Sequence, residues 1–105
     1  MIEPQTIDHV VEVIAENFAP RRIILFGSYA RDEAGPHSDL DLFVEMDPPL
    51  PERGRATLIK QSFNPYPCPM DIVVYSPDEV AYWQKAPASL VASVLREGKV
   101  LYERR

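Results

Sequence analysis

The chain has 105 residues, of which 46% are hydrophobic and 26% are charged, and it carries a formal net charge of -5 at pH 7. This length is enough for one domain with one modest core, so we expect residues 1–105 to form a single domain. The acidic balance gives no indication of broad affinity for nucleic acid, which usually shows as a basic patch.

The first part of the chain predicts an amphipathic helix followed by a buried strand. Apolar residues between 7 and 18 recur at the i, i+3, i+4 and i+7 spacing of a helix with one buried face. Thr6 is a candidate N-cap for this helix, and Pro20 marks its end. Residues 22–26 are apolar and β-branched and stop at Gly27, so we expect a strand that ends in a tight turn.

A short helix and a second strand are expected next. Residues 28–33 could form the helix, with Ser28 near its N-cap and Gly35 and Pro36 breaking it. The segment 39–45 predicts a strand, whose side chains alternate between two faces. One face would carry Leu40, Leu42 and Val44, and the other Asp39, Asp41, Phe43 and Glu45.

Prolines divide the middle of the chain. We expect a loop over 47–51, a helix over 53–63, a proline-rich loop over 64–69 and a strand over 70–75. The strand is the clearest of these elements, because it is a continuous apolar and β-branched segment.

Two helices and a short strand are predicted at the C-terminal end. Ser76 and Glu79 show the capping-box pattern of a helix start, and Pro77 suits the first helical position. Pro87 separates this helix from a last one that stops at Gly98, and residues 99–102 form the last expected strand. The apolar stripe of the last helix consists of Leu90, Val91, Val94 and Leu95.

Other features indicate a cytoplasmic protein. The single cysteine, Cys68, leaves no intrachain disulfide, which fits a reducing compartment. The N-terminus has no basic region followed by an apolar run, and no apolar stretch approaches the ~18 residues of a membrane span. We therefore expect no membrane association, and the sequence leaves open whether the chain forms homo-oligomers.

Gly27 and Ser28 form a candidate anion site. Glycine lets a ligand approach the backbone closely, Ser28 adds a hydroxyl, and the N–H groups of a following helix would favour negative charge. An ordinary turn between a strand and a helix would show the same two residues. The pair therefore has to be weighed together with the aspartates that follow.

Asp39 and Asp41 lie two residues apart in a predicted strand, so both side chains project from the same face. Two such carboxylates repel each other, and a divalent cation would remove the repulsion. Mg²⁺ prefers oxygen ligands and commonly takes one or two carboxylates together with substrate phosphates. The alternative is a solvated strand face, although aspartate is disfavoured in strands.

Asp71 is the third candidate carboxylate, at the start of the strand expected over 70–75. If this strand neighbours the one that contains Asp39 and Asp41, the three carboxylates could converge. Such a set suits in-line phosphoryl chemistry with one or two metal ions, in which Asp71 would help to activate the attacking hydroxyl. The alternative is a residue that faces solvent at the start of a strand.

The spaced pattern resembles the signature of the minimal nucleotidyltransferases, in the DNA polymerase β-like nucleotidyltransferase superfamily. It consists of Gly27-Ser28-x-Ala30-Arg31, a short interval, and then Ser38-Asp39-x-Asp41-Leu42. The later Asp71 matches the family's third carboxylate. The resemblance implies an α/β (α+β) fold with a mixed central sheet flanked by helices. It also implies transfer of a nucleoside monophosphate from ATP or another nucleoside triphosphate to a hydroxyl.

The resemblance also assigns roles to individual residues. Gly27 and Ser28 would contact the triphosphate, and Arg31 would steady phosphate or brace the turn. The metal and catalytic residues would be Asp39, Asp41 and Asp71, with Mg²⁺ as the cofactor.

The resemblance suggests a partner as well. Stand-alone members of the family are often encoded beside a small helical HEPN protein, act as its antitoxin, and in some cases transfer AMP to a tyrosine of that toxin. Two alternatives stay open: a binding module that neutralises a helical partner by contact alone, and a small-molecule nucleotidyltransferase that needs a partner subunit. Nucleic acid is the least favoured partner, because the chain is acidic.

Several other polar and aromatic side chains are expected to have structural roles. Arg53, Arg55 and Lys60 could reach phosphates, but a solvated helix face is the favoured interpretation. Ser38 is expected to order the loop before its strand. The aromatic residues Tyr82, Trp83 and Tyr102 are expected in the core or at an interface.

Overall fold

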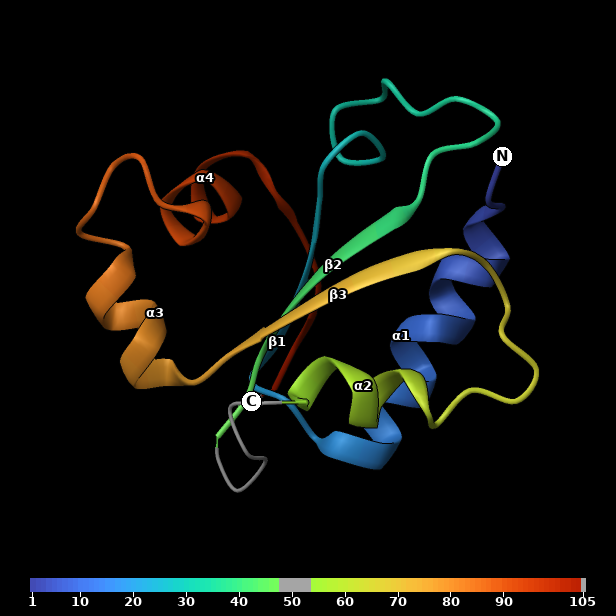
Figure 1. Ribbon diagram of the computed structural model, residues 1–105, viewed down its shortest axis with the longest axis horizontal. Coiled ribbons are helices and arrows are strands. Elements are labelled where there is room, and N and C mark those ends of the chain that lie inside the picture. Colours follow the sequence, from blue (N-terminus) through green and yellow to red (C-terminus); the bar gives the residue numbers. More distant parts are fainter. Residues whose placement is uncertain (48–53, 105) are drawn as a thin grey trace.

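The computed structural model describes residues 1–47 and 54–104, and a four-stranded sheet runs through it (Figure 1). The strands are arranged in the order β3-β2-β1-β4. β1 is antiparallel to β2 and to β4, whereas β2 and β3 are parallel. This mixed sheet with flanking helices confirms the expected fold class. In chain order the elements are α1 (Pro4–Phe18), β1 (Arg22–Phe26), β2 (Leu40–Glu45), α2 (Arg55–Lys60), β3 (Met70–Tyr75), α3 (Pro77–Trp83), α4 (Leu90–Glu97) and β4 (Lys99–Glu103).

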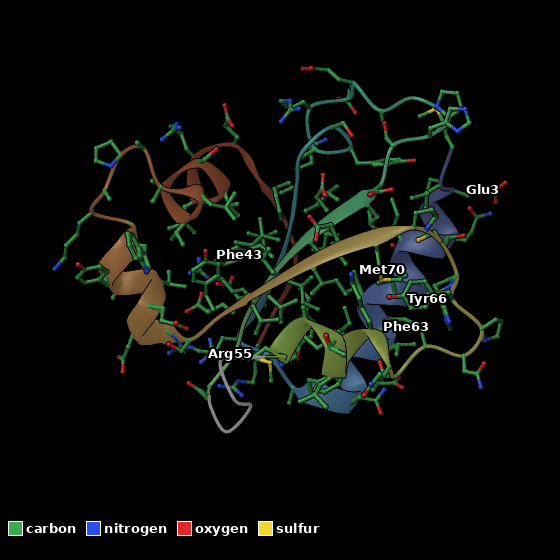
Figure 2. The ribbon with its side chains drawn as sticks, viewed as in Figure 1. Glu3, Phe43, Arg55, Phe63, Tyr66 and Met70 are labelled. Carbon is green, nitrogen blue, oxygen red and sulfur yellow. The ribbon has the colours of Figure 1, made fainter. Side chains whose placement is uncertain are left out.

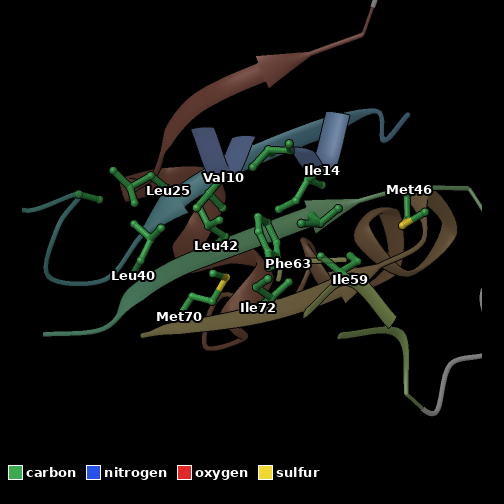
Figure 3. Close-up of a cluster of buried hydrophobic side chains, with 13 residues drawn as sticks. Val10, Ile14, Leu25, Leu40, Leu42, Met46, Ile59, Phe63, Met70 and Ile72 are labelled. Atoms are coloured by element: carbon green, nitrogen blue, oxygen red, sulfur yellow. The ribbon is translucent and has the colours of Figure 1, made fainter. Parts of the chain in front are cut away.

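Helices cover both faces of the sheet, with α1 and α2 on one side and α3 and α4 on the other (Figure 1). Two clusters of buried side chains result, and β1 contributes to both because successive side chains of a strand point to opposite faces. Ile23 and Leu25 enter the cluster beneath α1 and α2, which Figure 3 shows, and Ile24 enters the other. The cluster beneath α3 and α4 consists of Ile24, Phe43, Val80, Val91 and Val94.

Phe43 and Glu45 show that the polar face of β2 is covered along most of its length. Phe43 is fully buried, lies on the side of α3 and α4 (Figure 2), and stacks on Tyr75 with ring centroids 5.2 Å apart. Glu45 is only 5% exposed, and Arg22 Nε donates a hydrogen bond to its Oε1 at 2.7 Å. A buried carboxylate needs such a partner. The two alternating faces are therefore as expected, but the face with the carboxylates is open to solvent only near Asp39 and Asp41.

The first helix starts earlier than its apolar spacing predicts. It begins at Pro4, and its N-cap is Glu3, whose side chain makes no capping hydrogen bond. Thr6 is therefore inside the helix, and its predicted role as N-cap is wrong. Proline suits the first turn because its missing N–H would have no partner there, and this local preference adds a turn to the helix.

The helix expected over 53–63 is shorter in the structure, where α2 spans Arg55–Lys60. Residue 53 and most of the loop expected over 47–51 lie outside the described residues. The predicted strand over 70–75 and the capping box of α3 are confirmed. Ser76 Oγ accepts from the Glu79 N–H, and Glu79 Oε1 accepts from the Ser76 N–H at 2.7 Å. Among the helices of the described residues, none is both long and apolar enough to cross a membrane.

Candidate active site

The turn after β1 is a single turn stabilised by backbone hydrogen bonds, so the short helix predicted over 28–33 is wrong. The N–H groups of Ala30 and Arg31 both donate to the Gly27 carbonyl, at 3.1 and 3.2 Å. The Glu33 N–H then donates to the Ser28 carbonyl at 2.9 Å, across Asp32 at φ 57. This left-handed residue reverses the chain as the end of a helix does, and the turn therefore cannot be extended.

Asp41 and Asp71 lie side by side. They are register partners on the parallel strands β2 and β3, which places their backbones about 4.8 Å apart. Asp41 is half-buried and Asp71 is exposed. Asp41 is also the register partner of Phe26 in β1, so it points to the sheet face that α4 covers.

Asp39 directly precedes β2, which begins at Leu40 and not at Asp39. Its side chain is exposed, and its charge acts on Asp41. The structure therefore brings the three aspartates predicted from the sequence to one end of the sheet, where β1 ends and where β2 and β3 begin.

The electrostatics of the site centre on Asp41. Burial raises the pKa of the Asp41 carboxyl above its ordinary value, and the negative charges of Asp71 and Asp39 raise it further. The positive charge of Arg31 acts in the opposite direction. Ionised Asp41 is thus held in an environment that opposes its charge, and a bound cation would offset this repulsion.

Gly27 packs against the Asp41 carboxylate. A Cβ atom added to Gly27 would overlap Asp41 Oδ2, and the glycine has a φ of 75°. Both facts require a residue without a side chain, because L-residues rarely adopt this φ and because no space remains beside the carboxylate. The Gly-Ser turn and the carboxylates consequently form one structural unit.

Arg31 and Ser38 order the chain between the turn and β2. Arg31 Nε donates to Glu33 Oε1 at 3.3 Å, with both side chains largely exposed. Ser38 Oγ accepts from the Gly35 N–H at 2.9 Å. Each bond joins residues two or three positions apart, so each stabilises the local path of the loop that connects Ser28 to Asp39.

The donor chemistry of the three aspartates fits a hard divalent cation such as Mg²⁺, which takes carboxylate oxygens. Within residues 1–47 and 54–104, however, no three His, Cys, Asp or Glu side chains converge closely enough to hold a metal ion. The in-register pair of Asp41 and Asp71 is already adjacent, with Asp39 close enough to influence it. The assignment of these residues as metal ligands therefore stays a prediction.

A pocket of ≈ 230 Å³ separates the turn from α4. Phe26, Gly27 and Arg31 line it on the side of the turn, and Leu90, Ser93 and Glu97 line it on the side of α4. Ser93 Oγ donates to Glu97 Oε2 at 3.2 Å. Ser93 and Glu97 are not evident as site residues from the sequence, since their only local signal is the i, i+4 spacing on one helix face, which does not show what the helix packs against.

The remaining polar and aromatic candidates within the described residues lie on α2, α3 and β4, which are not the elements that carry the carboxylates. Arg55 donates to Glu79 Oε1 at 2.6 Å, beside the start of α3 (Figure 2), which contradicts the expectation of a solvated helix face for this arginine. Arg53 lies outside the described residues. Tyr82 and Trp83 are 68% and 45% exposed, so neither is a core residue. Tyr102 is half-buried against the cluster beneath α1 and α2.

The chain resembles known proteins in its sequence and in its fold. The model of the family described as "Nucleotidyltransferase domain" matches residues 7–101. Among curated proteins, the comparison finds no match. Among solved structures, the chain is similar to one from Sulfolobus solfataricus described as a "putative nucleotidyltransferase". The TM-score is 0.65 at 17% sequence identity, and the match covers 95% of this chain and 79% of that one. At this identity, the likeness shows the fold.

Proposed function

Because the chain belongs to the nucleotidyltransferase-domain family, we propose that it transfers AMP from ATP to a hydroxyl group and releases pyrophosphate. The observation that carries the proposal is the position of Asp41, which is in register with Asp71 on one side and packs against Gly27 on the other. A carboxylate pair and a close-approach glycine thus meet at one point, where the triphosphate would have to bind.

The turn and the carboxylates have distinct roles in this reaction. Gly27 and Ser28 contact the triphosphate, and Arg31 orders the turn through Glu33 while its charge favours ionised Asp41. The residues that would hold Mg²⁺ are Asp39, Asp41 and Asp71. When bound, Mg²⁺ would supply positive charge that polarises the phosphoryl oxygens.

Asp71 would take up the proton of the acceptor. Its side chain is exposed, so a hydroxyl from solvent or from another protein can approach it. The hydroxyl oxygen forms a bond to the α-phosphorus, and the bond from this phosphorus to the oxygen that bridges it to the β-phosphorus breaks. The electron pair of that bond leaves with pyrophosphate, and the proton passes to a carboxylate oxygen of Asp71.

For the acceptor, we propose a tyrosine of a small helical HEPN toxin, which the protein would neutralise as an antitoxin. The resemblance to the minimal nucleotidyltransferases supports this choice, through Gly27-Ser28 followed by Asp39 and Asp41. The exposure of Asp39 and Asp71 also supports it, because a side chain presented by a folded partner needs an open site.

Labelled nucleotide tests the proposal. The protein is incubated with ATP that carries its label on the α-phosphate, Mg²⁺ and lysate of the source organism, beside the double variant Asp39→Asn/Asp41→Asn. Asp8→Asn is the matched control, since Asp8 is exposed on α1 and lies outside the carboxylate cluster. We expect a labelled protein with the wild type and with the control but not with the double variant.

The other outcomes contradict separate parts of the proposal. A labelled band that persists with the double variant would remove Asp39 and Asp41 from the reaction. No labelled protein with any variant would reject a protein acceptor. Mass spectrometry of the labelled band identifies the modified side chain and decides whether the acceptor is a tyrosine.

A further inference from the structure

The pocket between the turn and α4 adjoins the candidate active site at Gly27. Gly27 forms part of its wall, and the same glycine packs against the Asp41 carboxylate. Asp41 and the pocket also lie on the same face of the sheet, because Asp41 pairs with Phe26 and Phe26 lines the pocket. A part of a ligand bound in the pocket would therefore be adjacent to a metal ion or phosphate bound at Asp41.

The side chains on the α4 side of the pocket are suited to hydroxyl groups. Glu97 presents a carboxylate that can only accept hydrogen bonds, and Ser93 can both donate and accept. Leu90 and Phe26 add apolar surface for the carbon atoms of a ring. Arg31 on the opposite side of the pocket is positively charged and suits a phosphate, whereas Glu97 would repel one, so the α4 side favours a neutral polyol.

Helix stability does not account for the position of Glu97. It is the last residue of α4, where the negative end of the helix dipole disfavours a carboxylate. Ser93 donates to it across one turn, which holds the carboxylate beside the pocket. The pocket volume of ≈ 230 Å³ is below the range of roughly 300 Å³ and more of sites for whole drug-sized ligands, and it suits a fragment the size of a sugar ring.

We propose that this pocket binds the ribose of the nucleoside triphosphate, with Glu97 and Ser93 binding its 2′- and 3′-hydroxyls. The inference rests on the proposed function, because the ribose is joined directly to the α-phosphate that reacts at Asp39, Asp41 and Asp71. Because Gly27 both contacts the Asp41 carboxylate and lines the pocket, a sugar on an α-phosphate held at Asp41 is within reach of the pocket. Glu97 then distinguishes ribonucleotides from 2′-deoxyribonucleotides.

Equilibrium binding tests this assignment. Dissociation constants are measured by calorimetry for ribonucleoside and 2′-deoxyribonucleoside triphosphates of each base, with a methylene group in place of the α–β bridging oxygen so that no transfer occurs. A hydrogen bond to a charged group predicts about tenfold or tighter binding of the ribonucleotide by the wild type. We expect Glu97→Gln to lower this ratio several-fold and Ser93→Ala to lower it less.

Glu103→Gln is the matched control. Glu103 is exposed like Glu97, but it lies at the opposite end of the sheet, where it is the register partner of Arg22. The control is expected to keep the wild-type ratio of dissociation constants. Thermal unfolding of each variant establishes that it is folded.

The experiment separates failure of the inference from failure of the proposed function. Equal affinity for ribo- and deoxyribonucleotides in the wild type, or an unchanged ratio in Glu97→Gln, overturns the ribose assignment alone. Absence of binding of any nucleoside triphosphate overturns both. If Glu97→Gln instead raises the KM of the acceptor and leaves the nucleotide ratio unchanged, the pocket belongs to the acceptor and the ribose assignment is wrong.

Discussion

Asp41 and Asp71 are register partners on β2 and β3, and the negative charge of Asp71 helps to raise the pKa of Asp41. The protein therefore holds two carboxylates together at an energetic cost, which is common at functional sites. The parallel pairing of the two strands enforces their proximity, because each aspartate occupies the second position of its strand.

Replacing Asp41 by asparagine should stabilise the protein in metal-free buffer. The pKa of Asp41 is raised in the folded protein, so its ionised form lowers the free energy of unfolding above that pKa. We expect Asp41→Asn to have a higher melting temperature than the wild type at pH 7. The gain should shrink as the pH falls through the folded pKa and vanish below about 3.9, the ordinary value of an aspartate.

The gain is measured by thermal unfolding of both proteins from about pH 3 to about pH 8, a range that spans the ordinary pKa of an aspartate. Asp8→Asn serves as the control, since Asp8 is exposed on α1. Equal stability of Asp41→Asn and the wild type at pH 7 would contradict the repulsion inferred here, and so would a gain that persists at the acidic limit.

Gly27 and Gly54 both have a positive φ, so alanine substitutions at the two positions distinguish the cost of backbone strain from the cost of steric overlap. An alanine at Gly54, which has φ 90, would meet no described atom within 4 Å, so Gly54→Ala should cost about 1–2 kcal/mol of backbone strain alone. Gly27→Ala should cost roughly 1–3 kcal/mol more, because its Cβ overlaps the Asp41 carboxylate. Urea unfolding of both variants gives the comparison. Similar losses in the two variants would show that Asp41 moves away without cost.

Arg31 should influence the pH dependence of transfer. Its positive charge lowers the pKa of Asp41, so Arg31→Gln should move the acidic limb of the pH–rate profile to higher pH. Arg31→Lys keeps the charge and should leave the limb nearly in place.

Glu33→Gln controls for the ordering of the turn, because it removes the charge partner of Arg31 but keeps the positive charge. An acidic limb that stays in place in Arg31→Gln, or that shifts upward equally in Glu33→Gln, would show that Arg31 acts only through the turn. The profiles are measured as kcat/KM for pyrophosphate release.

Local patterns predicted the strands more accurately than the helices. The strands expected over 22–26 and 70–75 have those bounds in the structure, because both are apolar segments closed by a glycine or by a capping serine. The helix expected over 28–33 does not form, since Asp32 adopts a left-handed conformation that ends the turn. At α1, the proline-initiated first turn extends the helix beyond its apolar stripe.

The sequence by itself determined the nucleotidyltransferase family and the carboxylates Asp39 and Asp41, since these depend on the short spacing that follows Gly27 and Ser28. Residues two apart in an extended segment project to the same side, which predicts that Asp39 and Asp41 act together although β2 begins only at Leu40, and Gly27 follows an apolar strand in any arrangement of the sheet. Only the tertiary structure decided that Asp71 stands in register with Asp41, that Gly27 packs against this carboxylate, and that Ser93 and Glu97 face the turn. These relationships join residues that are far apart in the chain. Strand pairing and helix packing create them as side chains such as Phe43 and Val94 are buried, and local periodicity does not specify which strands pair or where a helix packs.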